Sequence, residues 1–393
     1  MMDKIKSLGM NVYMGFLQMI TILTATVLIG TLVGIDIPVI LFTTGLGSIV
    51  FTILTKGKIP IGLGLSGSWC GTMIAMSAFG LDHIVGVTVI SGVLYVLFGL
   101  LIKWKPQILK LFTPYVLNLA VFMIAINLVT TAVGLVSTAP LTGIATVVSI
   151  GLLMKKKGFE RFAFPLGVLI GTIVHGFTVG LSSELTAMYI PTFVMPVINN
   201  VTLGSSLIFI ALVTEALGDS KLVADATGKG YDPSSVIVGN GVASIISGLL
   251  GGMSVTTYTE SCSLTRSTKH TDYKAIIFAG IFFIIMAFIP QVTMAINFIP
   301  IEALSGLLLY LFASVGLSKM NDTHAETRNE EIIGVLGLSA FFLAPHVFPN
   351  ISQIAVGMLV MIVVYVVLML IDKYKNYKQN KQKRGWQPLF FCI

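Results

Sequence analysis

Apolar residues along the chain form long runs that are separated by short polar turns. A run of about 20 apolar residues has the length at which an α-helix crosses the hydrocarbon core of a bilayer. The first run is too long for the apolar region of a signal peptide and lacks a small-residue cleavage site, so we interpret it as a span. The pattern predicts fourteen spans, at residues 10–33, 38–55, 60–80, 84–102, 113–136, 139–154, 162–182, 203–220, 233–252, 254–267, 274–295, 300–318, 331–345 and 351–371.

The composition excludes a water-soluble globular protein. Of the 393 residues, 55% are hydrophobic and 10% are charged, and the mean hydropathy is +0.94. Soluble domains carry about 25% charged residues, so this chain has too few to build a water-facing surface. The three cysteines, Cys70, Cys262 and Cys392, have no metal-binding spacing and form no disulfide framework. We therefore expect a multi-pass membrane protein without a metal or cofactor.

The basic residues test the number of spans. With a cytoplasmic N-terminus, all 24 Lys and Arg residues fall into eight clusters on the cytoplasmic side, and none remains for the outer side. Membrane proteins concentrate Lys and Arg in their cytoplasmic loops. Eight clusters on one side require fourteen crossings and place both termini in the cytoplasm. The net charge of +7 then indicates contact with anionic lipid headgroups rather than with nucleic acid.

Seven spans in each half predict an inverted repeat, because a duplicated unit with an odd number of spans must insert upside down. Such repeats place a transporter's binding site where broken helices of the two halves meet. A weak trace of duplication appears at an offset of 196 residues. The matching pairs are Gly45 and Gly241, Ser48 and Ser244, Ile49 and Ile245, and Leu54 and Leu250.

The third and tenth spans differ from simple helices. In the span at residues 60–80, Pro60 is followed by Gly62, Gly64, Gly67 and Gly71, which interrupt it. The span at residues 254–267 is short and begins with the β-branched run Val255–Thr257. Both segments resemble an extended stretch followed by a half-helix. Unwound backbone at membrane depth is tolerated only where protein or a watery cavity covers it. The alternative explanation is that the glycines allow tight helix packing.

Most of the 17 Asp and Glu residues fall in loops or at helix ends, but three do not and have no Lys or Arg near them within the membrane: Glu215, Asp219 and Glu260. Glu215 and Asp219 are four residues apart and so share one face of a helix. Carboxylates at membrane depth are costly and usually mark a substrate or ion pathway. A carboxylate accepts two adjacent N–H groups of a planar ligand, and a protonated one donates to a carbonyl. The alternative role of each is that of a polar residue that joins helices.

Five blocks of sequence resemble one family, the nucleobase–cation symporters, which include uracil and xanthine permeases and nucleobase–ascorbate transporters. The resemblance extends from Gly15 to about Met320. In chain order the blocks are GFLQMITILTATVLIG, TKGKIPIGLGLSGSW, TEALGDSKLVAD, SGLLGGMSVTTYTESCSLTR and IPIEALSGLLLYLFASVGL. Their order as well as their content matches the family.

The resemblance implies an all-α membrane protein of fourteen spans in a seven-plus-seven inverted repeat, with short strands before the half-helices of spans three and ten. It implies a core domain that moves against a gate domain in an elevator-like motion. The core would comprise residues 10–111 and 203–295, the gate residues 112–202 and 296–372, and residues 373–393 would form a cytoplasmic basic tail. A homodimer would form through gate spans five and twelve.

The resemblance also assigns roles to residues. Glu215 and Glu260 would hydrogen-bond the base, and the backbone around Trp69 and Thr259 would add contacts. The Trp69 ring would stack on the base, with Tyr258 as a neighbour. Asp219 and Glu215 would couple transport to a proton or a sodium ion. No cofactor is implied, and the expected location is the cell membrane.

Departures from the family's patterns point in different directions and leave the base undecided. Asp219 stands where uracil carriers usually have His and purine carriers have Asp. Glu260–Ser261 stands where purine and ascorbate carriers often have Gln-Asn, and Met19 replaces a common His. The string TTYTES also resembles adenine, guanine and hypoxanthine permeases. We expect a purine such as xanthine, uric acid or guanine slightly ahead of uracil.

Three other functions are weaker interpretations of the same sequence. An inorganic anion transporter of the same fold would favour a cation at the half-helix N-termini, and no Lys or Arg lies there. A membrane enzyme would use the carboxylates as acid and base, but no nucleophile or metal motif accompanies them. A channel would need polar lining groups along several helices, and these are missing.

Overall fold

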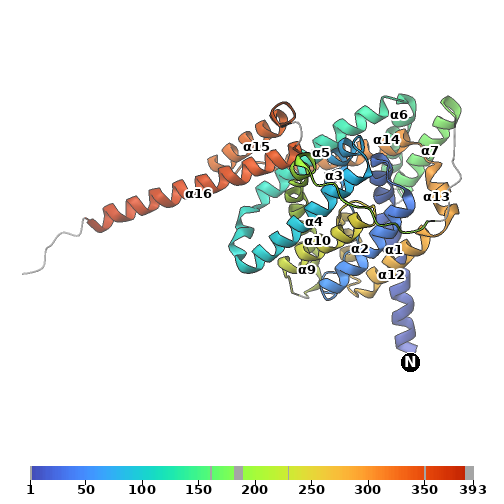
Figure 1. Cartoon of the computed structure of the whole chain (residues 1–393), viewed down its shortest axis with the longest axis horizontal. Helices are drawn as coiled ribbons and strands as arrows, with labels where there is room; N and C mark the ends of the chain where they lie inside the picture. Colours follow the sequence, from blue (N-terminus) through green and yellow to red (C-terminus); the bar gives the residue numbers. More distant parts are fainter. Residues whose placement is uncertain (1, 160–161, 181–188, 229, 349–350, 386–393) are drawn as a thin grey trace, which may run out of the picture.

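The chain folds into an almost entirely helical molecule, as the sequence predicts. The computed structural model describes all residues except 1, 160–161, 181–188, 229, 349–350 and 386–393. Figure 1 shows a bundle from which the first turns of α1 project at one side and most of α16 projects at another. The helices of the bundle surround the two short strands that position the candidate site.

The first half of the chain contains one short strand among helices of very different length. Its helices are α1 (Met2–Val33), α2 (Ile37–Leu54), α3 (Gly67–Ser77), α4 (Leu81–Trp104), the 3-10 helix η1 (Pro106–Leu111), α5 (Pro114–Val136), α6 (Pro140–Lys155) and α7 (Ala163–Thr178). Strand β1 (Leu63–Leu65) precedes α3.

The second half repeats this order, with a strand before a short helix. Its helices are α8 (Asn200–Ser206), α9 (Phe209–Thr227), α10 (Pro233–Leu249), α11 (Thr259–Thr268), α12 (Lys274–Ala287), α13 (Pro290–Asn297), α14 (Ile301–Asp322), α15 (Arg328–Val347) and α16 (Gln353–Gly385). Strand β2 (Val255–Thr257) precedes α11.

Membrane-spanning helices are abundant, but the number of fourteen stays a prediction. In the described part of the chain, eight helices are long and apolar enough to cross a bilayer, with α8 and α9 taken together, and α12 with α13 would add a ninth. Helices α6, α7 and α10 are apolar but shorter. The half-helices α3 and α11 reach membrane depth only in combination with their strands. Every predicted span nevertheless coincides with one of these elements.

Two predicted spans are broken rather than continuous, and the tail is helical. The predicted span at 274–295 bends by 85° between α12 and α13. Pro290 opens α13, and proline disfavours helical backbone in the preceding residue, here Ile289. The predicted span at 203–220 is interrupted between α8 and α9. Helix α16 continues beyond its predicted end through the first part of the basic tail, whose last residues, 386–393, lie outside the described part.

The prediction of extended stretches followed by half-helices is confirmed. Strands β1 and β2 pair antiparallel, with Leu63 opposite Thr257 and Leu65 opposite Val255. The pairing requires a glycine at one point, because a Cβ atom on Gly64 would lie 2.6 Å from the buried ring of Tyr258. The strand pair places the N-termini of α3 and α11 next to each other.

The weak internal duplication corresponds to a reciprocal packing of helices. A Cβ on Gly45 in α2 would lie 2.5 Å from the carbonyl oxygen of Gly280 in α12. In the other half, a Cβ on Gly241 in α10 would lie 2.7 Å from the carbonyl oxygen of Gly92 in α4. Small residues allow such close approach of helix backbones. Each half thus packs against the other through the glycine at the matching position, as an inverted repeat requires.

The matching serines hold the two strands in the same way. The Ser48 hydroxyl accepts from the backbone N–H of Leu63 at 2.9 Å and lies 3.4 Å from its carbonyl oxygen. The Ser244 hydroxyl accepts from the N–H of Val255 at 3.2 Å and donates to its carbonyl at 3.0 Å. Both serines are buried. They satisfy strand backbone groups that no further strand would pair with.

Two groups of helices pack mainly among themselves. Helices α1, α2, α4, α8, α9, α10 and α12 contact one another, and α5, α6, α7, α14, α15 and α16 form the second group. Figure 1 shows α6, α7 and α14 together at one side of the view and α15 beside α16 at the other. Contacts between the groups are made by α1 with α14 and by α9 with α5 and α16, and α3, which belongs to neither group, contacts α1 and α4 as well as α5. The division into core and gate domains follows these groups and stays a proposal.

Candidate substrate site

The candidate site lies where the strand pair brings α3 and α11 together beside α9. Strand β2 and helix α11 both pack against α9. The three predicted carboxylates come from these elements: Glu215 and Asp219 from α9, and Glu260 from the first turn of α11. The Glu215 and Glu260 carboxylates are close enough for their charges to interact. The structure therefore brings the predicted acidic residues together.

Glu215 is held by two serines of the first half-helix. Its Oε2 accepts hydrogen bonds from the hydroxyl of Ser66 at 2.6 Å and of Ser68 at 3.1 Å. Ser66 is also the N-cap of α3, where its hydroxyl accepts from the N–H of Ser68 at 3.2 Å. Neither serine was among the predicted site residues. Both belong to the motif Ser-Gly-Ser at the start of the half-helix, which was the available signal.

Asp219 joins α9 to the second half-helix. Its two carboxylate oxygens both accept from the hydroxyl of Thr259, at 3.1 Å each. Its carbonyl oxygen accepts from the Cys262 thiol at 3.6 Å. Asp219 is buried, with 6% of its surface exposed. It is therefore placed to fix α11 relative to α9 rather than to face a ligand directly in this conformation.

Glu260 is accessible, in contrast to its neighbours. Thr259 and Glu260 are exposed, whereas Tyr258 and Ser261 on either side are buried. Tyr258 occupies the N-cap position of α11 and makes no side-chain capping bond. The first N–H groups of a helix have no intrahelical partner. The accessible end of α11 therefore combines N–H groups that have no partner within the helix with a carboxylate acceptor.

The accessible face of α11 continues along the helix from the carboxylate. After Glu260, the exposed residues include Ser263, Arg266 and Ser267, which share one helical face with it. The opposite face, with Cys262 and Thr265, is buried. An accessible polar face thus extends from the carboxylate to the other end of the helix.

Helix α9 presents a similar accessible face beside α11. It begins at half-buried Glu215 and includes Gly218, Lys221 and Asp225. A Cβ atom on Gly218 would meet no atom within 4 Å, so the space beside it is open. In each helix the accessible face begins at a candidate carboxylate, Glu215 or Glu260, and extends toward the C-terminal end of that helix. Together they indicate access to the site from the ends of α9 and α11.

A buried hydrogen-bond network ties the second half-helix to α1. The Ser261 hydroxyl accepts from the backbone N–H of Gly62 at 2.8 Å and donates to Gln18 Oε1 at 2.7 Å. Gln18 Nε2 donates to the Thr265 hydroxyl at 2.9 Å, which donates to the carbonyl of Pro60 at 3.0 Å. The network fixes the position of α11, and sequence reasoning missed Gln18.

The two predicted aromatic residues lie at the site but are closed to a ligand in this conformation. The Trp69 side chain is fully buried, and its indole N–H has no hydrogen-bond partner among the described residues. Tyr258 is 5% exposed, with its ring against Gly64. Stacking of a ligand on the Trp69 ring would require that ring to become accessible. The stacking role therefore stays a prediction.

A further half-buried carboxylate lies away from the site and was not predicted. Glu302, in the first turn of α14, accepts from the Thr138 hydroxyl at 2.9 Å and lies 3.7 Å from His175 Nδ1. His175 is also 3.1 Å from the Thr142 hydroxyl. These contacts join α6, α7 and α14. They give His175 polar partners of the kind expected of a packing residue.

The charges of the site are not neutralised by basic residues. Among the described residues, no Lys or Arg forms an ion pair with Glu215, Asp219 or Glu260. The described part of the chain also contains no group of three or more His, Cys, Asp or Glu residues that could hold a metal ion. Two strand and half-helix segments that meet beside the carboxylates of α9 and α11, within a bundle of apolar helices, define a multi-pass membrane transport protein.

Comparison with known proteins gives the family. Residues 9–345 match the family model Xan_ur_permease, described as a permease family, and the chain belongs to this family. It is 27% identical to the uracil permease of Bacillus caldolyticus over 86% of this chain and 88% of that protein. It is 25% identical to the nucleobase transporter PlUacP of Paenibacillus larvae, over 75% of this chain and 74% of that protein. These relatives are transporters and not enzymes.

A solved structure shares the fold. The transmembrane domain of the cyanobacterial bicarbonate transporter BicA superposes with a TM-score of 0.67, over 91% of this chain and 97% of that one. The sequences are 14% identical, so this likeness concerns the fold alone. The helical membrane architecture predicted from the sequence is therefore that of known transporters.

Proposed function

We propose that this protein is a secondary transporter that carries a nucleobase across the cell membrane. Its relatives include proteins named as uracil permeases and a nucleobase transporter. The observation that carries the proposal is the meeting of Glu215 and accessible Glu260 at the N-termini of two half-helices. Half-helix termini of this kind form substrate sites in transporters that are built from inverted repeats.

The chemistry of these groups suits a planar base. The Glu260 carboxylate can accept two adjacent N–H groups of the base, and N–H groups at the start of α11, which have no partner within the helix, can donate to a ring carbonyl. Glu215 is already oriented by Ser66 and Ser68, so it meets the ligand with little loss of side-chain freedom. A base placed between the two carboxylates would satisfy both.

Coupling to an ion would use the acidic residues of α9. We propose that Glu215 and Asp219 take up the coupling ion, which is a proton or sodium, because no basic residue offsets their charge. Movement would occur between the core (10–111 and 203–295) and the gate (112–202 and 296–372), in an elevator-like step. Both termini would lie in the cytoplasm, and a homodimer would form through the gate helices α5 and α14.

The identity of the base rests on opposing indications. Asp219 resembles the residue of purine carriers and favours xanthine, uric acid or guanine. Relatives named as uracil permeases favour uracil. An inorganic anion, as the name of BicA suggests for that protein, is disfavoured here because three carboxylates and no basic residue surround the site.

Uptake of radiolabelled bases by cells or proteoliposomes tests the proposal. Glu215→Gln and Glu260→Gln should each lower kcat/KM for the transported base by about 100-fold, since each removes charged hydrogen bonds worth about 1.5 to 3 kcal/mol. Glu302→Gln, a half-buried carboxylate outside the site, is the matched control and should transport normally. Normal uptake by both site variants, or uptake of labelled bicarbonate and of no base, would overturn the assignment.

A further inference from the structure

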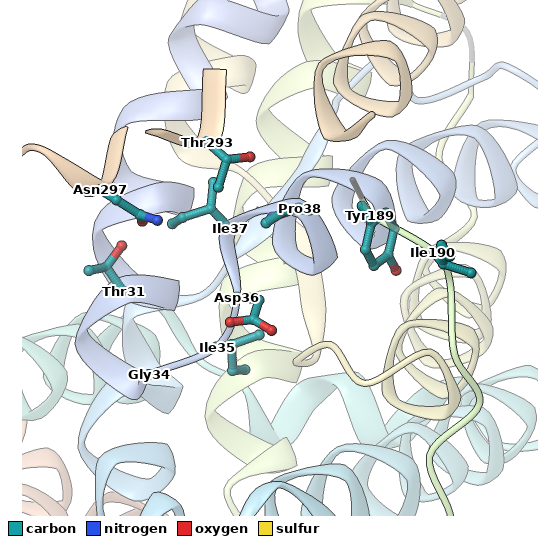
Figure 2. Close-up of a pocket in the computed structure, with 10 residues that line it drawn as sticks. All are labelled: Thr31, Gly34, Ile35, Asp36, Ile37, Pro38, Tyr189, Ile190, Thr293 and Asn297. Atoms are coloured by element: carbon teal, nitrogen blue, oxygen red, sulfur yellow. The ribbon is translucent and has the colours of Figure 1, made fainter. Parts of the chain in front are cut away.

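A cavity lies in the fold that shares no residue with the candidate substrate site. Its volume is about 460 Å³. It is enclosed by the turn between α1 and α2, by the chain at Tyr189–Ile190 and by α13, as Figure 2 shows. In the predicted orientation this turn lies on the outer side of the membrane. Neither the comparisons nor the proposed function gives this cavity a role.

An unused carboxylate stands in the middle of this cavity. Asp36 occupies the N-cap position of α2, yet its side chain makes no capping hydrogen bond. An aspartate at this position normally accepts from the N–H two or three residues later, but Pro38 has no N–H to offer. Asp36 is exposed, and its carboxylate has no hydrogen bond or ion pair with another described residue. Figure 2 shows it between Thr31 and Asn297 on one side and Tyr189 on the other.

Three hydroxyl groups around the cavity also lack partners. The side-chain oxygens of Thr31, Thr293 and Tyr189 are buried and make no hydrogen bond among the described residues, and all three residues line the cavity. Leaving a buried hydroxyl unpaired costs about 1 to 3 kcal/mol. Three such groups around one cavity are an unusual concentration, because nearly all buried polar groups in proteins are paired. A ligand that binds beside Tyr189 and toward which Thr31 and Thr293 rotate would recover that cost.

Tyr189 is held in place and remains a donor. Its ring lies 5.6 Å from that of Phe42 and 5.8 Å from that of Phe288, measured between centroids. Burial, and to a smaller extent the nearby charge of Asp36, raises the pKa of the Tyr189 hydroxyl to about 12. The hydroxyl therefore keeps its proton at neutral pH. It can donate to a carbonyl of a ligand that faces Asp36.

The chemistry of the lining selects the class of ligand. No Lys or Arg is among the described residues that line the cavity, so an anion would face an uncompensated carboxylate. The volume is far larger than a bare metal ion occupies, and the one carboxylate in the described lining gives too few charged ligands for a metal ion. Apolar side chains such as Ile37 and Ile190 form other parts of the wall. A small, flat, neutral molecule with adjacent N–H and carbonyl groups satisfies the carboxylate, the hydroxyls and the apolar walls.

We propose that this cavity is a second binding site for a nucleobase, which presents its N–H edge to Asp36 and a carbonyl to Tyr189. This inference rests on the proposed function, because it takes the transported base as the ligand. The site is separate from Glu215 and Glu260 and holds the base before it reaches them. A base bound at this site raises the local concentration of base near the substrate site of the same protein chain.

Equilibrium binding to the purified full-length protein tests the inference, with radiolabelled uracil and radiolabelled xanthine as probes. The wild type should bind two molecules of its base per chain. Asp36→Asn should bind one, or bind the second at least tenfold more weakly, and Tyr189→Phe should weaken the second site several-fold. Asp82→Asn removes another exposed carboxylate outside the cavity, which contacts His83, and should keep both sites.

The outcomes separate this inference from the proposed function. One site per chain in the wild type, unaffected by Asp36→Asn, overturns the second site and leaves the proposed function standing. Loss of both sites in a Glu215→Gln, Glu260→Gln double variant that still elutes as a folded monodisperse protein also overturns it, since the sites are then not separate. A wild type that binds neither base overturns the proposed function and this inference with it.

Discussion

The two half-helix segments have the same backbone plan and different chemistry. In each, a three-residue strand leads into a short helix, and a serine of a neighbouring helix holds the strand. Yet α3 begins with a capped, closed first turn, in which Ser66 accepts from a backbone N–H and Trp69 is fully buried. Helix α11 begins uncapped, with Thr259 and Glu260 exposed.

This difference shows how a duplicated scaffold acquires a site. The segment with α3 acts as a support: its serines orient Glu215 but present no charge. The segment with α11 presents a carboxylate and unpaired N–H groups on an accessible helix end. Such an end attracts polar ligand groups, because its N–H donors have no partner within the helix. The two segments therefore share one backbone structure but have different roles, support for α3 and ligand binding for α11. Substitutions at single positions can test this contrast.

The largest effect is expected at the strand pair, on which both segments depend. Gly64→Val would place side-chain atoms within the buried ring of Tyr258, since even a Cβ there lies 2.6 Å from that ring. Overpacking of this kind costs about 1 to 3 kcal/mol and sometimes more. We expect little folded protein, measured by size-exclusion chromatography and thermal unfolding in detergent.

The matched control lies in the opposite strand. Thr257 pairs with Leu63, and its buried hydroxyl has no partner among the described residues. Thr257→Val keeps the shape and removes that hydroxyl, so the unfolding temperature should stay the same or rise. A Gly64→Val protein with wild-type yield and unfolding temperature would show that the close approach of the two strands is not required.

The network that anchors α11 should have the next largest effect. Ser261→Ala leaves the buried N–H of Gly62 and the Gln18 amide without their partner. An unsatisfied buried group costs about 1 to 3 kcal/mol, so we expect a stability loss of about 2 kcal/mol by chemical unfolding. Ser267→Ala, an exposed serine of the same helix, should change stability by less than about 0.5 kcal/mol. Equal effects of the two substitutions would contradict the anchoring role.

The sequence predicted the fold well because the membrane leaves few choices. The apolar runs were enough to place the helices, and the glycines after Pro60 and the β-branched run Val255–Thr257 were enough to place both broken segments. The residues of the weak duplication have matching structural roles. At Gly45 and Gly241 two helix backbones approach closely, and the hydroxyls of Ser48 and Ser244 hydrogen-bond the strands. The pair Leu54 and Leu250 has no such explanation in the structure.

The sequence could not predict contacts that depend on three-dimensional packing. Polar partners such as Ser66 and Gln18 are ordinary residues whose role appears only when distant segments meet. Pro290 could have predicted the bend between α12 and α13. It was not predicted because the apolar run at 274–295 continues through the bend and was interpreted as one helix. Asp36 resembled a loop charge, and only the structure shows that it stands unpaired in a cavity.

The support role of α3 predicts a moderate effect on transport. Ser66→Ala removes the 2.6 Å hydrogen bond to Glu215 and the cap of α3. One such bond is worth about 1.4 kcal/mol, which is tenfold in affinity, so KM for the base should rise about tenfold. Ser66→Thr keeps the hydroxyl and should restore most of the affinity. Ser77→Ala, at the far exposed end of α3, should leave KM unchanged, and a change there would argue against a specific support role.

The smallest effect on transport is expected for a substitution of Ser263. This substitution also tests most directly whether α11 is accessible while α3 is closed. It lies on the accessible face of α11, whereas the native Cys262 beside it and Cys70 at the equivalent position of α3 are buried. In a Cys392→Ser background, Ser263→Cys should transport the base within about twofold of the wild type. A membrane-impermeant thiol reagent should modify it and should stop transport, and excess base should slow the modification.

The two native cysteines are the controls in this experiment. They should stay unmodified in the folded protein and react only after denaturation, because both are buried. Inside-out and right-side-out vesicles then distinguish the side of access: the predicted orientation requires modification from the cytoplasmic side. Modification of Cys70 at the rate of the new cysteine would mean that α3 is as open as α11, and the division into a closed support and an accessible binding segment would be wrong.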